Sequence, residues 1–209
     1  IVGYQNLGKL YNCGNTGKIE GRDNVGGISG YSRQSSKLYN CYNAGHIVGK
    51  DWVGGIIGYC DTYDFAPLET QVKNCINWGM IEAQDGMEYV GSICGLNVST
   101  VSNCYWLCDP EKGLGMERGI GITESRGKTE KCFALTQDQM ASEANSLTPL
   151  YTTVDKKTYF YVLDALNAWS YDYNSVDMKL IGWEKSNDRG FPVLSGKSAE
   201  KPDENVPVF

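Results

Sequence analysis

Histidine is almost absent from this sequence, and His46 is the only one among 209 residues. Lys18 and Met80 stand at the equivalent positions of the repeats described below, so this position accepts any kind of side chain. Such tolerance indicates a solvent-exposed face. Catalysis by imidazole needs the ring beside a nucleophile or a metal ion. The sequence therefore argues against Ser-His-Asp and Cys-His catalytic schemes.

Positive charge is also scarce. The chain has 19 Lys and Arg against 25 Asp and Glu, which gives a formal net charge of −6. Proteins that bind nucleic acid or anionic lipid use basic surfaces to neutralise the phosphates. We expect no such basic surface here, and therefore no nucleic-acid partner.

Long apolar runs are missing as well. No stretch of 18 apolar residues occurs, so we expect no membrane span in this chain. The first residues show neither the basic nor the apolar region of a signal peptide. They do match the end of a repeat, because Ile1-Val-Gly-Tyr4 corresponds to Ile28-Ser-Gly-Tyr31. We therefore expect the chain to be part of a longer protein.

Common cofactor motifs are absent too. The glycine-rich stretch 113–121 spells neither GxGxxG nor a P-loop. Cys104 and Cys108 lack the CxxC spacing and the second cysteine pair of a zinc ribbon. The sequence predicts no cofactor and no zinc site.

What the sequence does contain is an internal repeat. Residues 10–31, 38–59 and 72–96 are close copies, and a fourth copy begins at Val101. The cysteines near the start of each copy are 28, 34 and 29 residues apart: Cys13, Cys41, Cys75 and Cys104. A nearly fixed period in this range marks an architecture of stacked repeats.

Each repeat reads as a series of short strands. One position is apolar in every copy while its neighbours vary, as in a strand with one inward face: Ile19, Ile47 and Ile81. A second apolar pair is three residues apart in each copy: Val25 and Ile28, Val53 and Ile56, Val90 and Ile93. Strict alternation would put the two members on opposite faces, so we expect a bend or bulge at the intervening glycines.

Stacking is the way in which such repeats bury their apolar faces. The sequence predicts a mostly β fold, a right-handed parallel β-helix or related β-solenoid with repeats of about 28 residues. Equivalent residues would then form ladders of cysteine, asparagine and isoleucine. An antiparallel β-sandwich is the alternative, but it would not require residue-for-residue periodicity.

The repeat pattern fades after Cys108. We therefore predict a solenoid at 1–108, an α+β capping segment at 109–196 and a tail at 197–209. Residues 113–131 read as a charged, glycine-rich loop, and solenoids need a cap over their exposed edges.

Two short helices and two strands are expected in the capping segment. Thr136 and Gln139 form a capping box that opens a helix at 137–144. Thr158 is expected to cap a second helix at 159–169. Strands are expected at 178–184 and 191–194.

The eight cysteines admit two interpretations. The four at the repeat positions are explained as small, buried thiols of the core. Cys60, Cys94, Cys108 and Cys132 lie outside that set. A Cys108–Cys132 disulfide that closes the glycine-rich loop is the alternative to free thiols.

Three aspartates fall ten residues after a repeat cysteine: Asp23, Asp51 and Asp85. Like charges stacked at strand spacing repel, so either the loops diverge or a cation lies between them. Calcium prefers oxygen ligands and is the candidate metal. The calcium-binding nonapeptide is absent, however, and aspartate is ordinary in turns.

Aromatic residues give the clearest indication of a binding surface. Four of them fall where we expect outward-facing positions: Tyr42, Trp52, Trp78 and Tyr105. Aromatic rings beside carboxylates and amides can hold sugar rings by stacking and hydrogen bonding. The competing interpretation is that Tyr and Trp are simply favourable in strands.

Glycine-apolar-apolar-glycine segments carry a resemblance to a known family. Gly27-Ile-Ser-Gly30 and Gly55-Ile-Ile-Gly58 follow Val-Gly pairs, and residues 134–140 and 190–194 add a closing helix and strand. Over about residues 1–196 the chain resembles the GLUG-motif repeat proteins of bacterial cell surfaces. It departs from their pattern at Ser29, Ser92 and Cys94. The resemblance implies an extracellular, adhesin-like module, and it supplies no catalytic residues.

These observations favour a non-enzymatic binding or spacer module of a larger protein at the bacterial cell surface. Its expected partner is a host or dietary glycan or a host surface protein, and we expect a monomer within the larger chain. The alternative is a carbohydrate-binding module attached to a secreted glycan-degrading enzyme. A polysaccharide lyase or glycosidase is a third option, but a glycosidase needs carboxylates about 5–9 Å apart and the sequence fixes no such pair.

Overall fold

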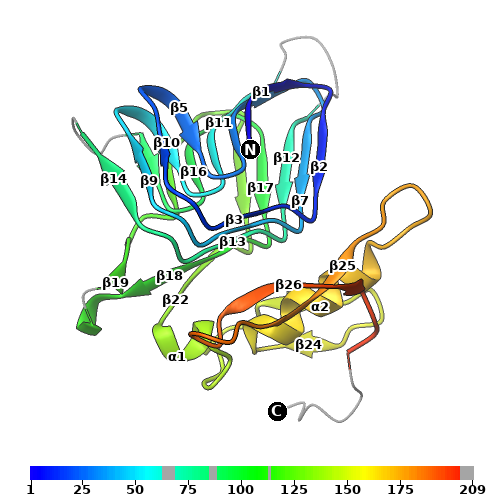
Figure 1. The fold of residues 1–209 in the computed structure, drawn as a ribbon. Coiled ribbons are helices and arrows are strands. Elements are labelled where there is room, and N and C mark those ends of the chain that lie inside the picture. Colours follow the sequence, from blue (N-terminus) through cyan, green and yellow to red (C-terminus); the bar gives the residue numbers. More distant parts are fainter. Residues whose placement is uncertain (63–68, 85–88, 113, 203–209) are drawn as a thin grey trace. The chain divides into compact units, whose positions relative to one another are not determined.

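A computed structural model describes residues 1–62, 69–84, 89–112 and 114–202. The chain forms two compact units, Ile1–Ala134 and a second unit from Leu135 onward (Figure 1). In the described ranges no helix has both the length and the apolar character needed to cross a membrane.

Five sheets build the first unit, and each takes one strand from successive turns of the chain (Figure 1). Sheet A contains β1 (Val2–Asn6), β6 (Ser29–Arg33), β11 (Ile57–Cys60), β16 (Cys94–Asn97) and β20 (Ile120–Thr123). Sheet B contains β2 (Lys9–Tyr11), β7 (Lys37–Tyr39), β12 (Gln71–Lys73), β17 (Thr100–Ser102) and β21 (Lys128–Glu130).

The other three sheets complete each turn. Sheet C contains β3 (Gly14–Asn15), β8 (Tyr42–Asn43), β13 (Ile76–Asn77) and β18 (Tyr105–Asp109), and β18 also pairs with β19 (Leu114–Gly115) and β22 (Phe133–Leu135). Sheet D contains β4 (Ile19–Glu20), β9 (Ile47–Gly49) and β14 (Ile81–Ala83). Sheet E contains β5 (Asp23–Gly26), β10 (Asp51–Gly54) and β15 (Val90–Gly91).

Strand register confirms the predicted solenoid. Equivalent residues of successive repeats are direct neighbours in parallel pairs, as in Val25–Val53–Val90 and Ile19–Ile47–Ile81. An antiparallel sandwich would not align the copies in this way. The fold class is therefore a mostly β parallel solenoid, while its handedness stays a prediction.

The three-residue spacing of Val and Ile places the two side chains of each pair in different hydrophobic cores. The chain does bend between β5 and β6, but the two side chains enter different cores. The isoleucines lie in the main core with the stacked cysteines: Ile28, Ile56 and Ile93. The valines lie in a smaller core with the sheet D isoleucines: Val25, Val53 and Val90. Each turn is thus divided into two packed lobes.

The residue before each stacked cysteine has a left-handed backbone conformation. Its φ is 54°, 60°, 53°, 50° and 53° at Asn12, Asn40, Asn74, Asn103 and Lys131. Asparagine tolerates this region better than most residues, which explains its recurrence. The amide side chains also connect the turns, because Asn40 Nδ2 donates to Asn12 Oδ1 at 2.8 Å and Asn74 Nδ2 donates to Asn40 Oδ1 at 2.9 Å.

The solenoid extends beyond the predicted boundary at Cys108. β20 pairs with β16 and β21 pairs with β17, so a further turn lies within the segment that we expected to be a loop. The first unit accordingly ends at Ala134. Lys131 takes the place of the usual asparagine, which removed the sequence signal for this turn.

The second unit is an α+β structure. It contains α1 (Gln137–Met140), β23 (Tyr151–Thr152), β24 (Thr158–Tyr159), α2 (Val162–Asp172), β25 (Ile181–Lys185) and β26 (Pro192–Ser198). The capping box between Thr136 and Gln139 is confirmed. The expected cap at Thr158 is wrong, because Thr158 lies in β24 and Tyr161 precedes α2 without a side-chain cap.

The predicted tail at 197–209 begins too early. β26 continues through Ser198, and the amide of Ala199 donates to the carbonyl oxygen of Leu180 at 3.0 Å. Residues 203–209 lie outside the described ranges. That the second unit covers the end of the solenoid stays a prediction.

Candidate functional site

All eight cysteines are free thiols, as expected for the four repeat cysteines, and the alternative Cys108–Cys132 disulfide does not form. Cys132 is a fifth member of the stack. Its Sγ donates to the carbonyl oxygen of Glu130 at 3.4 Å and of Val101 at 3.6 Å, as Cys104 does to Ser102 and Val72. Burial raises the pKa of Cys75 well above its ordinary value. Buried, protonated thiols of this kind are core residues rather than nucleophiles.

The aspartates proposed for calcium are only partly described. Asp23 and Asp51 are direct neighbours on β5 and β10. Arg22 Nε lies 3.6 Å from Asp23 Oδ2 and offsets part of the repulsion between the two carboxylates. Asp85 lies outside the described ranges. Among the described residues no group of three or more His, Cys, Asp or Glu side chains is placed to hold a metal ion. The calcium site stays a prediction.

The four predicted aromatic residues do not form one surface. Tyr42 and Trp78 stack on sheet C, with ring centroids 5.2 Å apart and planes 3° apart. Gly14 leaves room for Tyr42, because a Cβ there would lie 2.2 Å from Tyr42 Cε1. Trp52 belongs to sheet E instead. Tyr105 is fully buried, with the ring of Phe133 stacked 6.5 Å away, so it cannot stack on a ligand.

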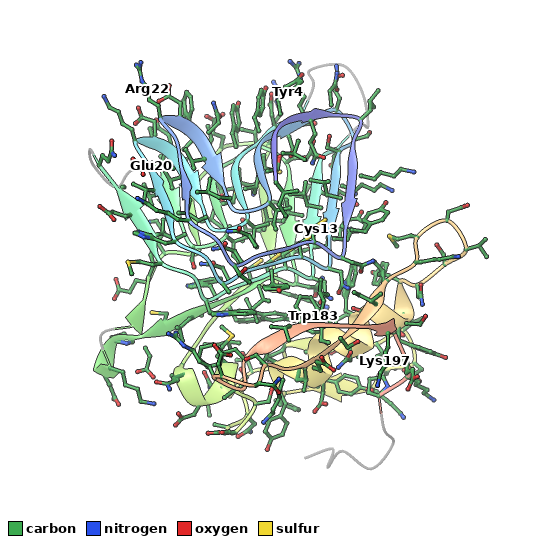
Figure 2. The ribbon with its side chains drawn as sticks, viewed as in Figure 1. Tyr4, Cys13, Glu20, Arg22, Trp183 and Lys197 are labelled. Atoms are coloured by element: carbon green, nitrogen blue, oxygen red, sulfur yellow. The ribbon has the colours of Figure 1, made fainter. Side chains whose placement is uncertain are left out.

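A longer row of rings lies along sheet A. Tyr4, Tyr31 and Tyr59 are aligned on β1, β6 and β11. The ring centroids of Tyr4 and Tyr31 are 5.4 Å apart, and those of Tyr31 and Tyr59 are 4.9 Å apart. Trp52 lies 5.9 Å from Tyr59 and 6.3 Å from Tyr89, which makes the row continuous over five rings. We call these five residues the aromatic row. Figure 2 shows Tyr4 pointing outward, whereas Cys13 lies within the stack.

Close packing of two backbones places Trp52 in this row. A Cβ at Gly58 of sheet A would lie 2.5 Å from the carbonyl oxygen of Trp52, so only glycine lets sheet E approach so closely. Trp52 itself has a φ of 52°, the conformation of Asn24 (φ 53°) one turn earlier. This conformation is uncommon for a bulky residue and is a strained one. The turn therefore imposes a left-handed conformation on this position, and in the second copy of the repeat the residue there is Trp52.

Charged groups of both signs flank the row: the carboxylates of Asp61 and Glu124 and the guanidinium of Arg33. The Tyr31 hydroxyl donates to Asp61 Oδ2 at 2.5 Å, and burial together with this contact raises the pKa of Tyr31. Burial, with added contributions from Asp61 and Glu124, raises the pKa of Tyr59 to about 12. Both phenols are therefore neutral hydrogen-bonding groups at neutral pH.

The rings differ in what they offer a ligand. Tyr31 and Tyr59 lie nearly parallel, with 13° between their planes, so one face of each ring is covered by the other ring. Tyr4 is tilted by 60° from Tyr31 and is 53% exposed, and Trp52 is tilted by 33° from Tyr59. The tilted rings, Tyr4 and Trp52, are therefore the ones placed to stack on a ligand, beside the hydroxyl groups of the central pair.

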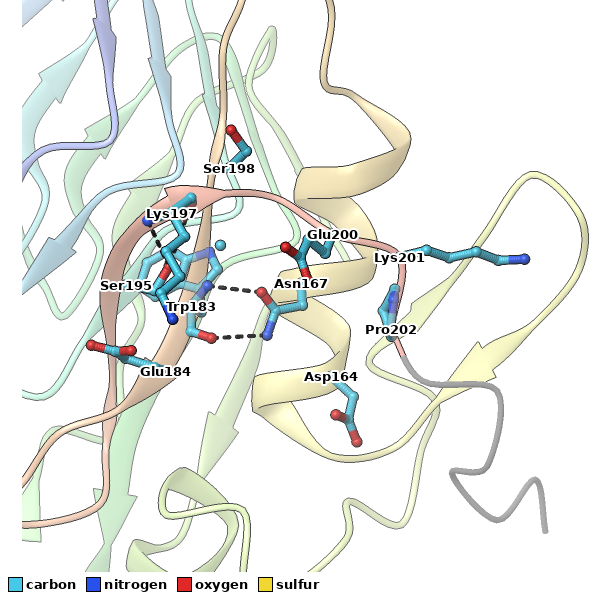
Figure 3. Close-up of a pocket in the computed structure, with 11 residues that line it drawn as sticks. Asp164, Asn167, Trp183, Glu184, Ser195, Lys197, Ser198, Glu200, Lys201 and Pro202 are labelled. Carbon is cyan, nitrogen blue, oxygen red and sulfur yellow. Dashed lines mark hydrogen bonds between the residues drawn. The ribbon is translucent and has the colours of Figure 1, made fainter.

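A polar pocket of about 390 Å³ lies in the second unit (Figure 3). Asn167 lines it, but its amide already accepts from the Trp183 backbone N–H at 2.8 Å and donates to the Trp183 carbonyl at 3.1 Å (Figure 3). Charges of both signs make up much of the rest of the wall: Asp164, Glu184, Lys197, Glu200 and Lys201. Since its central amide holds the β25 backbone, this pocket is a weaker candidate than the aromatic row.

Sequence reasoning found one of the five rings. The missed signal is the residue that closes each Gly-apolar-apolar-Gly segment, which is tyrosine in three successive turns: Tyr4, Tyr31 and Tyr59. Recognising these as one aligned column requires the register of sheet A.

No protein-family model, curated protein or solved structure matches this chain, so the resemblance to GLUG-motif proteins stays a prediction from the sequence.

Proposed function

We propose that this chain is a non-catalytic binding module of a larger bacterial cell-surface protein, and that it holds a glycan on the aromatic row. The observation that supports this proposal is the continuity of five rings across three turns of sheet A and the adjoining strand of sheet E. Separate aromatic residues on a surface are common, whereas an extended row flanked by a carboxylate fits an extended ligand.

The chemistry of the row suits sugars. The apolar C–H face of a pyranose ring packs on an aromatic face, which Tyr4 and Trp52 can provide. Sugar hydroxyls need donors and acceptors, and the phenols of Tyr31 and Tyr59 and the carboxylate of Asp61 lie in the same row. The indole N–H of Trp52 is buried and has no hydrogen-bond partner among the described residues, so Trp52 offers a ligand its ring face and not this donor.

The resemblance to GLUG-motif proteins supports the proposed setting, which is extracellular and adhesin-like. A module of a secreted glycan-degrading enzyme would use the same surface in the same way. A pure spacer would need the stacked turns but not the aromatic row. Variants of the row therefore separate binding from spacing.

A glycan array followed by titration calorimetry tests the proposal. Tyr4→Ala and Trp52→Ala should each weaken binding of the glycan found on the array about fivefold, since one stacked ring contributes about 1 kcal/mol. Trp78→Ala is the matched control, because its ring stacks on Tyr42 on a different sheet. Equal weakening by all three variants would mean that the aromatic row is not the binding surface. An array without a ligand would favour the spacer function instead.

A further inference from the structure

The outer face of sheet B gathers lysine and tyrosine side chains. Lys9 and Lys37 are direct neighbours on β2 and β7. Two residues further along these strands Tyr11 lies beside Tyr39, and Tyr39 lies beside Lys73 of β12. The rings of Tyr11 and Tyr39 stack, with centroids 5.5 Å apart and planes 22° apart. We call these five residues the lysine–tyrosine patch.

Carboxylates act on this patch without pairing with it, since Glu130 and Glu69 raise the pKa of Lys73 from a distance. In the described parts of the chain, none of Lys9, Lys37 and Lys73 forms an ion pair. Lys128, at the far end of the sheet, is the lysine that pairs with a carboxylate, since its Nζ lies 3.3 Å from Glu69 Oε1. The patch is thus a local excess of positive charge on a chain whose net charge is −6.

Tyr39 holds two of these lysines in place. The Nζ atoms of Lys37 and Lys73 each lie 5.9 Å from the centroid of its ring, within the range of a cation–π contact. The Tyr39 hydroxyl in turn donates to the side chain of Gln71. Both ammonium groups therefore lie within reach of the same ring.

This arrangement is unfavourable without a counter-charge. Lys9 and Lys37 repel each other at strand spacing, about 4.7–4.9 Å between adjacent strands. Burial, and then the charge of Lys37, lowers the pKa of Lys73, while Glu130 and Glu69 act in the opposite direction. An anion beside the three ammonium groups would offset both the repulsion and the lost solvation.

We propose that the lysine–tyrosine patch is a second binding site, which takes the carboxylate or sulfate groups of an anionic polysaccharide. Anionic groups spaced along a sugar chain match cations spaced along successive strands, and Tyr11 and Tyr39 add aromatic surface for the sugars. A nucleic acid fits less well, because its dense charge would meet only three cations before reaching an acidic surface. The site lies on a different sheet from the aromatic row and does not rest on the function proposed for that row. The expectation of no basic surface rested on the net charge of −6, which does not show that Lys9 and Lys37 are neighbours.

Dextran sulfate and uncharged dextran, which share one backbone, test the site by titration calorimetry at low salt. The full chain should bind dextran sulfate and not dextran. The double variant Lys37→Gln/Lys73→Gln should lose at least tenfold in affinity for dextran sulfate. The exposed single variant Lys9→Gln should lose less. Lys185→Gln/Lys197→Gln, which changes the net charge equally in the second unit, should change the affinity less than twofold. Tyr4→Ala should leave it unchanged.

Three results would overturn the proposal. Equal losses in the patch variant and in the matched charge variant would mean that net charge alone sets the affinity. Equal binding of dextran and dextran sulfate would mean that the patch recognises no anion. The chain could bind single-stranded DNA more tightly than dextran sulfate and lose that binding in the patch variant. That result would assign the site to nucleic acid. Circular dichroism of each variant establishes that a loss of binding is not a loss of folding.

Discussion

The two units of this protein use the same side chain in different ways. In the first unit, Asn43 accepts from Asn15 Nδ2 at 2.7 Å and donates to Asn77 Oδ1 at 2.7 Å, so its partners are its own counterparts in adjacent turns. In the second unit, Asn167 holds the backbone of Trp183, a partner unrelated to it in sequence. A periodic sequence therefore reveals contacts in the first unit, whereas in the second unit it reveals only local structure.

The largest effect is expected where the first unit depends on glycine. Gly3 and Gly58 occupy equivalent positions on β1 and β11. A Cβ at Gly58 would lie 2.5 Å from the carbonyl oxygen of Trp52, whereas a Cβ at Gly3 would have no atom within 4 Å. Gly58→Ala should lower the free energy of unfolding of this unit by about 3 kcal/mol or more, because backbone atoms cannot move aside easily.

Gly3→Ala is the matched control and should change the stability by less than about 0.5 kcal/mol. Hydrogen exchange measured peptide by peptide reports the two units separately. Protection in the second unit should not change in either variant. Equal and small effects of both substitutions would mean that sheets A and E do not pack backbone to backbone.

Much of the first unit was predictable from the sequence for this reason. The period predicted the register, and with it the ladder of asparagines before the stacked cysteines. The last turn was missed because Lys131 replaces that asparagine and because Gly119-Ile-Gly121 lacks the usual Val-Gly before it. Local deviations of this kind do not prevent strand pairing, since the backbone supplies the hydrogen bonds.

The candidate site was less predictable because faces depend on bends. Trp52 was placed with Tyr42 and Trp78 on the assumption that one outward face continues through a repeat. The chain instead folds into two lobes, and the left-handed conformation of Trp52 turns its ring toward Tyr59. Charge composition is limited in a similar way, because it does not show that the register makes Lys9 and Lys37 neighbours.

The next largest effect on stability is expected from substitution of the asparagines compared above, and it should be larger in the first unit than in the second. Asn43→Ala removes a fully buried amide together with its bonds to Asn15 and Asn77, which keep only the bonds to their own turns and to Ser92, at a cost of about 2–3 kcal/mol. Asn167→Ala removes two hydrogen bonds at a half-buried position, where water can replace them, at a cost of about 1 kcal/mol.

Hydrogen exchange again gives the measurement, read in the unit that carries each substitution. Loss of Asn43 should reduce protection on both neighbouring turns, while loss of Asn167 should act on β25 alone. A local effect for both would show that the asparagine ladder does not couple the turns.

The smallest effect concerns a pH dependence at the aromatic row. Burial raises the pKa of Tyr59 to about 12 from an ordinary value of 10.0. A raised pKa means that the neutral form is favoured in the folded state, so this contribution to stability is complete below about pH 10 and is lost as pH rises toward about 12. In the second unit burial, and then the hydrogen bond to Asp172, raises the pKa of Tyr151 as well.

Absorbance at 295 nm, compared between the parent and Tyr59→Phe, isolates the Tyr59 transition, and Tyr151→Phe isolates its counterpart. A Tyr59 transition near pH 10 would mean that its ring is solvated and that the aromatic row is not packed. A transition near pH 12 would support a row in which Tyr59 is packed against its neighbours, Tyr31 and Trp52.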